Sequence, residues 1–414
     1  MKILWFTLTP SCYKPQKDGY NGGGWISSLE QEIKKQPELS LGVAFLHNDS
    51  CFKTVKGGVA YYPMARNNSL PARAKRFFCL KQDEMELALC QRVIDDFKPD
   101  IIHVFGTESS FGLICKHTSI PVIIHLQGLM APYINAWIPP FFSLWDYFKK
   151  DGCSPLKIAF TIRSWFFNVY AAKREQKIMS SCRYFMGRTA WDKAYVELNA
   201  PDAKYFHCDE MLRDVFYLPE KRCATTKLVF ISTLSPPLYK GHDLVLKTAK
   251  ILTEQCSLNF EWKIYGVNNI KLAEKKTRIK ADFVNLTCMR RVSAEELKQD
   301  LLSCSIYIHP SYIDNSPNSL CEAQVLGVPI IATNVGGVSS LITDKHDGLL
   351  VPANDPVMIA KHILALTKAP ELAEKMSQAA KEAASSRHSK HKIINTILRI
   401  YNDIKNTPRE SAHV

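Results

Sequence analysis

The amino-acid sequence predicts an α/β fold made of two doubly wound parallel-sheet domains. Short Val- and Ile-rich runs recur along the 414 residues, and each is followed by a longer stretch with helical spacing. The runs are continuously apolar, which is typical of strands covered by helices on both faces, as in parallel sheets. Eleven such runs are too many for one compact sheet, so two domains are expected.

The expected strands fall into two sets along the chain. The first set comprises Ile3–Thr9, Leu41–His47, Asp100–Phe105, Pro121–Leu126 and Arg183–Gly187. The second set comprises Lys227–Thr233, Phe260–Tyr265, Phe283–Cys288, Ser305–His309, Pro329–Thr333 and Gly348–Val351. The segment between them with the weakest pattern is 219–226, so we expect a first domain over 1–218, a linker over 219–226 and a second domain over 227–386. The remaining stretch, 387–414, is expected to be mainly helical.

Composition narrows the classes of function. The apolar share of 46% and the charged share of 22% exclude a globally disordered chain. The net charge of +13 and pI near 9.0 indicate an anionic partner, which is a phosphate-bearing ligand, a membrane surface or nucleic acid. Nucleic acid is disfavoured because the positive charge is spread over both halves without a recognition motif.

Cysteines and apolar runs give an expectation for the compartment. The thirteen cysteines are scattered, with no CxxC pair, which predicts reduced thiols in the cytoplasm and no zinc site. The apolar N-terminus is too short for a signal peptide. No apolar run reaches the ~20 residues of a membrane span. A peripheral position on the inner face of the membrane stays open.

Open parallel sheets bind ligands beyond the carboxyl ends of their strands, so the loops there are the candidate site. Gly22–Gly24 opens a helix after the first strand, where backbone can approach a phosphate; the alternative is a flexible turn. Lys240, beside Gly241, ends another such loop and is placed as a point charge for a diphosphate. A solvated loop lysine is the alternative there.

Two further strand-end loops carry polar or glycine residues. Asp314 follows the strand expected at 305–309, and Glu322 lies on the next expected helix. The two carboxylates are thus placed to accept hydrogen bonds from the hydroxyl groups of a ligand. Glu322 is alternatively part of a helix-capping box. A glycine pair, Gly336 and Gly337, follows the strand at 329–333.

The order of these motifs resembles the retaining GT-B glycosyltransferases of family 4, the glycosyl transferases group 1. The likeness rests on the Lys240-Gly241 loop, the strand ending at Gly266, and Pro310-Ser-Tyr-Ile-Asp314 with seven residues before Glu322. It continues through 327–337 and 347–352, so it spans about 227–352. The first half resembles the family only loosely, at 22–24 and at the strand end before Gly128.

The resemblance implies a role for each matching residue. Lys240 and Asp314 would be catalytic: Lys240 would pair with the donor diphosphate, and Asp314 would hold the donor sugar. Glu322 would bind the ribose. The whole implied donor set is Gly22, Gly23, Gly24, Thr233, Gly241, Gly266, Asn315, Ser316, Pro317, Asn318, Ser319, Leu320 and Glu322. The acceptor-side positions are His125, Gln127 and Gly128.

The sequence departs from the family pattern at several of these positions. Asp314 stands where the family has Glu, one methylene longer. Thr233 occupies the position of a diphosphate-binding arginine, and Arg188 is the candidate catalytic substitute, unless it is an ordinary surface arginine. Gln127 occupies the position of a histidine. His125, two residues earlier, is expected to be a hydrogen-bonded core residue and no base.

The segment 141–180 combines aromatic and basic side chains. Its ten aromatic residues are Phe141, Phe142, Trp145, Tyr147, Phe148, Phe160, Trp165, Phe166, Phe167 and Tyr170. Interleaved lysines and arginines make it a candidate surface for anionic lipid, with core packing as the equal alternative. A smaller basic and aromatic patch lies at 73–78.

These observations lead to one expected function and one alternative. We expect a retaining glycosyltransferase that moves a sugar from a nucleotide-diphosphate donor to a glycan or lipid-linked acceptor in surface polysaccharide biosynthesis. The resemblance implies no metal and no other cofactor, and a last helix that crosses back to the first domain. The alternative is a GT-B sugar-nucleotide epimerase, which has no acceptor.

Overall fold

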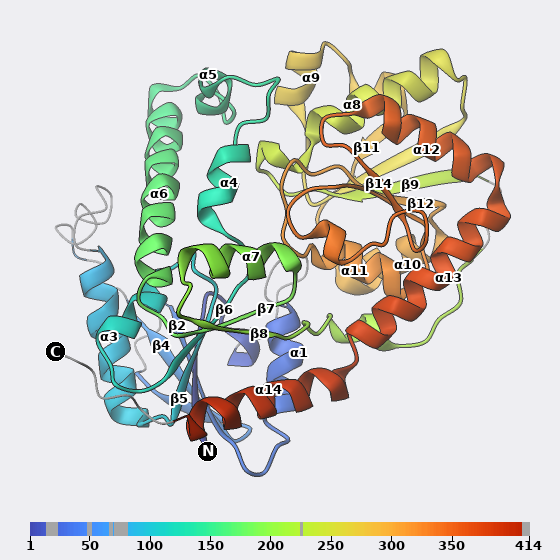
Figure 1. Ribbon diagram of the computed structural model, residues 1–414. Helices are drawn as coiled ribbons and strands as arrows, with labels where there is room; N and C mark the ends of the chain where they lie inside the picture. Colours follow the sequence, from blue (N-terminus) through green and yellow to red (C-terminus); the bar gives the residue numbers. More distant parts are fainter. Residues whose placement is uncertain (14–23, 48–51, 66–68, 70–81, 224–226, 408–414) are drawn as a thin grey trace.

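The computed structural model describes residues 1–13, 24–47, 52–65, 69, 82–223 and 227–407, and shows two α/β domains (Figure 1). The predicted fold class is therefore confirmed. Each domain has a central sheet between layers of helices, as the continuously apolar strands require.

The first sheet has eight strands in the order β3-β4-β2-β1-β5-β6-β7-β8. All neighbours pair in parallel except β3 and β4, which are antiparallel. The strands are β1 Lys2–Thr7, β2 Ser40–Leu46, β3 Thr54–Lys56, β4 Val59–Met64, β5 Ile101–Phe105, β6 Val122–His125, β7 Tyr184–Gly187 and β8 Lys204–His207. The helices are α1 Gly24–Ile33, α3 Gln82–Phe97, α4 Met130–Ala136, α5 Leu144–Phe148, α6 Pro155–Met179 and α7 Ala190–Asn199.

The second sheet has six parallel strands in the order β11-β10-β9-β12-β13-β14. The strands are β9 Leu228–Thr233, β10 Phe260–Tyr265, β11 Leu286–Cys288, β12 Ile306–His309, β13 Ile330–Thr333 and β14 Leu349–Val351. The helices that follow β9 along the chain are α8 His242–Lys250, α9 Lys271–Thr277, α10 Ala294–Ser303, α11 Asn318–Val325, α12 Pro356–Lys368, α13 Pro370–Arg387 and α14 Lys390–Asn406. Every strand expected from the sequence is present, and β3, β4 and β8 are additional.

The chain passes between the domains earlier than the expected linker. Met211 packs in the core of the first domain, whereas Leu212 and Phe216 pack in a core of the second. Residues 212–223 then run along the second domain, where the Arg222 guanidinium donates to the carbonyls of Cys304 and Gly327. The crossing therefore lies at 211–212 and not at 219–226, of which 224–226 fall outside the described residues.

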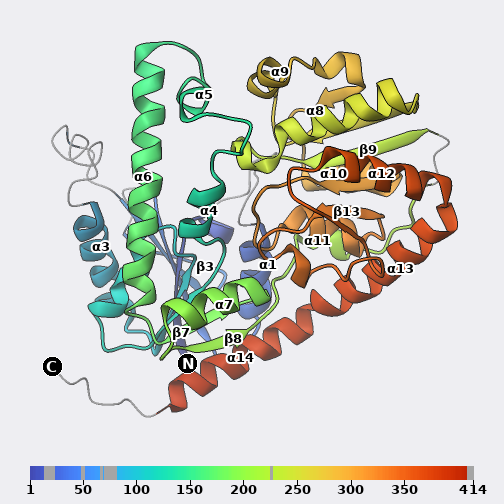
Figure 2. The same cartoon turned by 45° about the horizontal axis from the view of Figure 1, so that its top comes forward.

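The chain returns to the first domain through α14, which extends from the end of α13 along that domain (Figure 2). One face of α14 is buried in the first core, through Ile393, Ile397 and Tyr401. The Tyr401 hydroxyl accepts a hydrogen bond from Trp5 Nε1 at 3.1 Å and lies 2.6 Å from His103 Nδ1. Apolar burial and these buried polar contacts together fix α14 on the first domain.

A second connection runs through the segment 137–148. Phe142 and Tyr147 are buried in the core of the second domain, and Asp146 pairs with Lys276 of α9 at 2.7 Å. Part of the aromatic segment is thus core packing, the alternative that its sequence left open. Phe148 and Trp165 are partly buried against the same core, whereas the aromatic side chains that remain exposed are those of Phe141, Trp145, Phe160 and Phe166.

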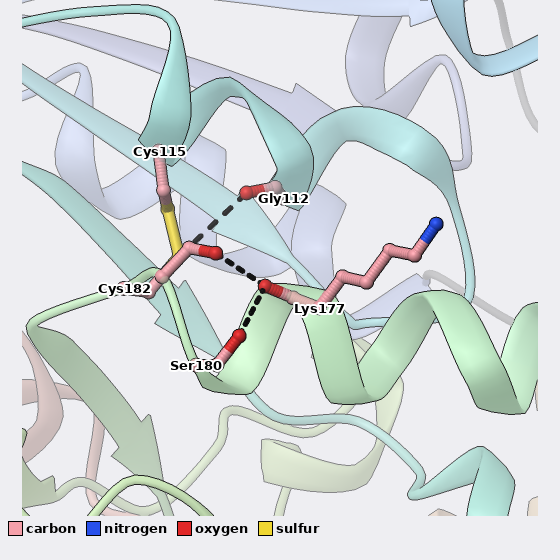
Figure 3. The surroundings of a disulfide bond; sticks show 6 residues. Gly112, Cys115, Lys177, Ser180 and Cys182 are labelled. Carbon is pink, nitrogen blue, oxygen red and sulfur yellow. Dashed lines mark hydrogen bonds between the residues drawn. A yellow bond between two sulfur atoms is a disulfide. The ribbon is translucent and has the colours of Figure 1, made fainter.

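One cysteine pair corrects the expectation of scattered thiols. Cys115 and Cys182 form a disulfide with their Cα atoms 5.5 Å apart, beside the end of α6 (Figure 3). They are 67 residues apart in sequence, so spacing gave no indication of the pair. The fold brings them together because the short helix at 110–116 packs against α6. The other cysteines in the described ranges are free thiols.

Candidate active site

A pocket of about 320 Å³ lies between the carboxyl edges of the two sheets. Its lining combines both domains: Gly24, Trp25, Arg213, Thr233, Leu234, Ser235, Lys240, Leu297, His309, Ser316, Pro317, Asn318, Ser319 and Glu322. Eight of the predicted site residues are in this set. Gly22 and Gly23 lie outside the described residues, as does the patch at 73–78.

Lys240 is held at the pocket by the glycine that follows it. Gly241 has φ +83°, and a Cβ there would lie 2.1 Å from the Pro310 carbonyl oxygen. Only glycine allows this close approach. It brings the Lys240 ammonium to the loop after β12, where Nζ lies 2.6 Å from Asp314 Oδ2.

Asp314 is the centre of a buried polar cluster. Its Oδ2 also lies 3.1 Å from His309 Nε2 and accepts from the Ser311 hydroxyl at 3.3 Å. Burial alone would raise the pKa of Asp314, but the Lys240 charge and the His309 hydrogen bond outweigh it and hold the pKa well below its usual range. The carboxyl is therefore ionised throughout the physiological pH range.

Glu322 forms an ion pair with Arg213, a residue that no sequence pattern indicated. Arg213 Nε and Nη2 donate to Glu322 Oε1 and Oε2, both at 2.7 Å, which is the bidentate geometry of a strong ion pair. Glu322 is only 2% exposed, while Arg213 faces the pocket. Arg213 thus brings a cation to the pocket that Thr233 also lines.

The loop 315–320 serves partly as pocket wall and partly as contact between domains. Ser316 to Ser319 line the pocket at the start of α11, whose first turn has no side-chain cap. Asn315 instead faces the first domain: its Nδ2 donates to the Gln127 carbonyl at 3.1 Å, and its Oδ1 accepts from the Thr189 hydroxyl at 2.8 Å. Leu320 is buried in the second core and contributes no side chain to the pocket.

The glycine pair after β13 shapes the same loop. A Cβ at Gly336, where φ is +52°, would lie 2.0 Å from the Asp314 carbonyl oxygen. A Cβ at Gly337 would lie 2.4 Å from the Asn315 carbonyl oxygen. The pair therefore allows the 334–338 turn to support the Asp314 loop from behind. Gly266, with φ +91°, turns the chain after β10 and does not line the pocket.

Arg188 is buried and lies outside the pocket lining. Its Nη1 pairs with Glu210 Oε2 at 2.7 Å, and its guanidinium lies 5.8 Å from the ring centre of Trp25. Burial raises the pKa of Glu210 to about 7, although the Arg188 charge opposes the shift. Arg188 is therefore no surface arginine, and any effect on a ligand would act through Trp25 or Glu210.

The acceptor-side residues lie at the end of β6. His125 is fully buried and stacks on His103 with ring centres 5.3 Å apart. Burial lowers the pKa of His125 well below its usual value, and His103 and Arg188 lower it further. Neither ring nitrogen has a hydrogen-bond partner among the described residues, so the expected hydrogen bond of His125 is wrong, although its core position is confirmed. The Gly128 amide donates to Glu108 Oε1 at 3.1 Å.

Within the described ranges, His, Cys, Asp and Glu side chains do not gather in threes as metal ligands. None of the described helices is long and apolar enough to cross a bilayer.

Comparison with known proteins identifies the class of protein that has such a pocket between two facing sheets. Residues 220–383 match the family model "Glycosyl transferases group 1", so the resemblance is confirmed for most of the second domain. Sucrose-phosphate synthase from Thermosynechococcus elongatus is similar in structure over 97% of this chain and 98% of its own, with a TM-score of 0.71 at 14% identity. Anabaena HepE, solved with UDP, matches 97% of this chain and 100% of its own, with a TM-score of 0.62 at 14% identity. The fold is therefore GT-B.

Sequence relatives match over shorter stretches. An uncharacterized glycosyltransferase of Methanocaldococcus jannaschii is 24% identical over 176 residues, which are 42% of this chain and 48% of that protein. The amylovoran biosynthesis glycosyltransferase AmsK of Erwinia amylovora is 29% identical over 138 residues, which are 31% of this chain and 33% of that protein. The chain spans about half, or less, of the length of these curated relatives.

Proposed function

We propose that this chain is a retaining glycosyltransferase that moves a sugar from a nucleotide-diphosphate donor to a glycan or lipid-linked acceptor in surface polysaccharide biosynthesis. The observation that carries the proposal is the interdomain pocket, where Lys240, Arg213 and the start of α11 converge on one space. A helix N-terminus and fixed cations are the groups that bind a diphosphate.

The same groups explain how the transfer is accelerated. When the bond between sugar and phosphate stretches, negative charge collects on the leaving diphosphate. Fixed cations and amide groups stabilise that charge more in the transition state than in the bound donor, which is the condition for a higher kcat. The family resemblance implies that no metal is required, so activity is expected to persist in EDTA.

Two relatives support the choice of donor and pathway. The HepE structures hold UDP and UDP-glucose, which supports a nucleotide sugar as donor here. AmsK acts in amylovoran biosynthesis, which supports a polysaccharide product.

The acceptor is proposed to be lipid-linked because exposed apolar and cationic side chains gather around α5 and the start of α6, beside the contact with the second domain. Six large apolar side chains are exposed between residues 141 and 166: Phe141, Leu144, Trp145, Leu156, Phe160 and Phe166. We call the part formed by α5 and the first turns of α6 the α5–α6 tip. Lys149 and Lys150 lie over the rings of Trp145 and Tyr147, and Lys157 reaches the turn at Gly152. Exposed rings beside lysines suit the interface of an anionic membrane.

A thermal-shift panel of UDP-, GDP- and ADP-sugars tests the donor. A donor at 100 times its Kd is expected to raise the unfolding free energy by ~2.7 kcal/mol. Product analysis with the stabilising donor, with and without acceptor lipid, then separates the transferase from the epimerase. Conversion of the donor sugar without any acceptor would favour the epimerase, and stabilisation by none of the nucleotides would contradict both.

Glu322 is expected to bind the ribose of the donor. In Glu322→Ala, loss of two hydrogen bonds to a carboxylate should cost about 2 kcal/mol, or roughly thirtyfold in the Kd of the nucleoside diphosphate. Isothermal titration with that diphosphate measures the change. Glu382→Ala, at an exposed position on α13, is the control and should bind as the wild type does. Unchanged binding in Glu322→Ala would show that the carboxylate serves only to hold Arg213.

A further inference from the structure

We propose that Asp314 and Tyr133 are positioning residues: Asp314 fixes the Lys240 ammonium, and Tyr133 of the first domain fixes Asp314. This inference rests on the proposed function and changes the role of Asp314 within it. On this view the carboxylate does not hold the donor sugar.

The surroundings of Asp314 leave little capacity for a ligand. A carboxylate offers about four acceptor sites. Here Oδ2 faces Lys240, His309 and Ser311, and Oδ1 accepts from the Tyr133 hydroxyl at 3.2 Å. Asp314 is only 5% exposed and is not among the residues that line the pocket. Its partners are thus protein groups, and of these Lys240 and His309 reach the pocket. Lys240 brings the ammonium charge to it.

Tyr133 makes the corresponding contact from the other domain. Besides donating to Asp314, its hydroxyl accepts from the Asn315 amide at 3.1 Å, so it bridges two consecutive residues of the second domain. Its ring packs edge-on against Tyr239, with centres 5.3 Å apart. Tyr239 directly precedes Lys240, so Tyr133 supports Lys240 from two directions.

The hydroxyl of Tyr133 is itself held in place by the first domain. Tyr133 lies on α4, and the Met130 and Ala131 amides at the start of α4 donate to the Glu175 carboxylate at 2.8 and 3.0 Å. The opposite end of the contact is equally fixed, since Gly336 and Gly337 support the Asp314 loop. Through the Tyr133 side chain and Asp314, α4 of the first domain is therefore connected with the ammonium of Lys240.

Asp314→Asn separates positioning from sugar binding. If Asp314 acts through Lys240, the substitution should change the Kd of a nucleoside diphosphate and that of its sugar conjugate by the same factor, within about twofold. The probes are UDP with UDP-glucose, GDP with GDP-mannose and ADP with ADP-glucose. The kcat of transfer should fall by about a hundredfold. If the conjugate alone is weakened, by more than about fivefold, the carboxylate holds the sugar and the inference is wrong.

Tyr133→Phe tests the contact across the domains. We expect kcat to fall about tenfold at saturating donor. The Kd of the nucleoside diphosphate should stay within about twofold, because Asp314 keeps its contacts with Lys240, His309 and Ser311. Tyr62→Phe is the matched control: it removes a 2.6 Å bond from a buried tyrosine to a carboxylate, Asp96, within the first domain. That control should keep its kcat, and thermal unfolding of both variants checks their folding.

Two results would contradict the role of the Tyr133 contact. One is an unchanged kcat in Tyr133→Phe, and the other is an equal loss in Tyr62→Phe. A wild-type protein that binds none of the nucleotides would instead contradict the proposed function itself, so the two failures are distinguishable.

Discussion

Replacing Lys240 by alanine is expected to lower the turnover of sugar transfer by ~10²–10³-fold, the scale of losing one preorganised group that stabilises transition-state charge. The ammonium lies at the pocket, 2.6 Å from Asp314, and the family's arginine is absent at Thr233. Lys240 should therefore carry a large share of the charge that meets the leaving diphosphate. Steady-state kinetics with the donor identified by thermal shift measure the loss.

Two controls make the Lys240 result specific. Lys263→Ala removes another lysine of the second domain, paired with Asp300 and outside the pocket lining, and should keep its turnover. Lys240→Ala leaves the buried Asp314 charge without its main partner, which destabilises a fold. The double variant with Asp314→Asn removes that charge, so it should recover stability but not activity. Near-normal transfer by Lys240→Ala would show that this loop does not serve the diphosphate.

The same assay separates the two arginines. Arg213 lines the pocket and Arg188 is buried with Glu210 behind Trp25. We expect Arg213→Ala to lower kcat more than Arg188→Ala does, because of the two only Arg213 lines the pocket. The reverse order would show that Arg188 replaces the charge absent at Thr233.

Removing the lysines of the α5–α6 tip is expected to release the protein from anionic vesicles. Each cation near such a surface contributes ~1 kcal/mol, so changing Lys149, Lys150 and Lys157 to Ser should weaken partitioning about a hundredfold. Exposed apolar groups adjoin these lysines: Trp145 is 57% exposed and Leu156 66%. Flotation with vesicles of phosphatidylglycerol and phosphatidylcholine measures the bound fraction.

The structure offers a control on the same helix. Lys173 lies sixteen residues beyond Lys157 on α6, about 24 Å at 1.5 Å per residue, so it stands far from the tip. Lys173→Ser should therefore float almost as the wild type does. Equal release by both variants would indicate general electrostatic attraction, and a wild type that does not float at all would contradict the membrane proposal.

The strands that the sequence predicted share one physical property. They are buried on both faces, so their residues are continuously apolar, as in β12 and β13. Two of the missed strands, both at sheet edges, lack that signal: β8 reads Lys-Tyr-Phe-His, with its first and last residues exposed, and β3 is three residues long. The third, β4, is largely apolar and buried, so this reason does not cover it. Edge strands have less to bury, so tertiary pairing decides their conformation.

The residues of the candidate site also fall into those that local sequence could predict and those that it could not. Lys240, Glu322 and the start of α11 are local features of strand-end loops, and the structure places all of them at one pocket. Arg213 could not be predicted, because it follows the missed strand β8 and reaches Glu322, 109 residues away, only through the chain crossing at 211–212. The Tyr133 contact spans 181 residues and the disulfide 67, and no local pattern encodes such pairs.

The return of α14 has a consequence for synthesis on the ribosome. The buried face of α14 completes the first core, yet Tyr401 follows its partner His103 by 298 residues. At 5–20 residues per second, roughly 15–60 s pass between the translation of the two. During that time the nascent first domain exposes the apolar surface that α14 later covers. The protein is therefore expected to depend on chaperones while it is being made, even though α14 buries this apolar surface in the folded protein.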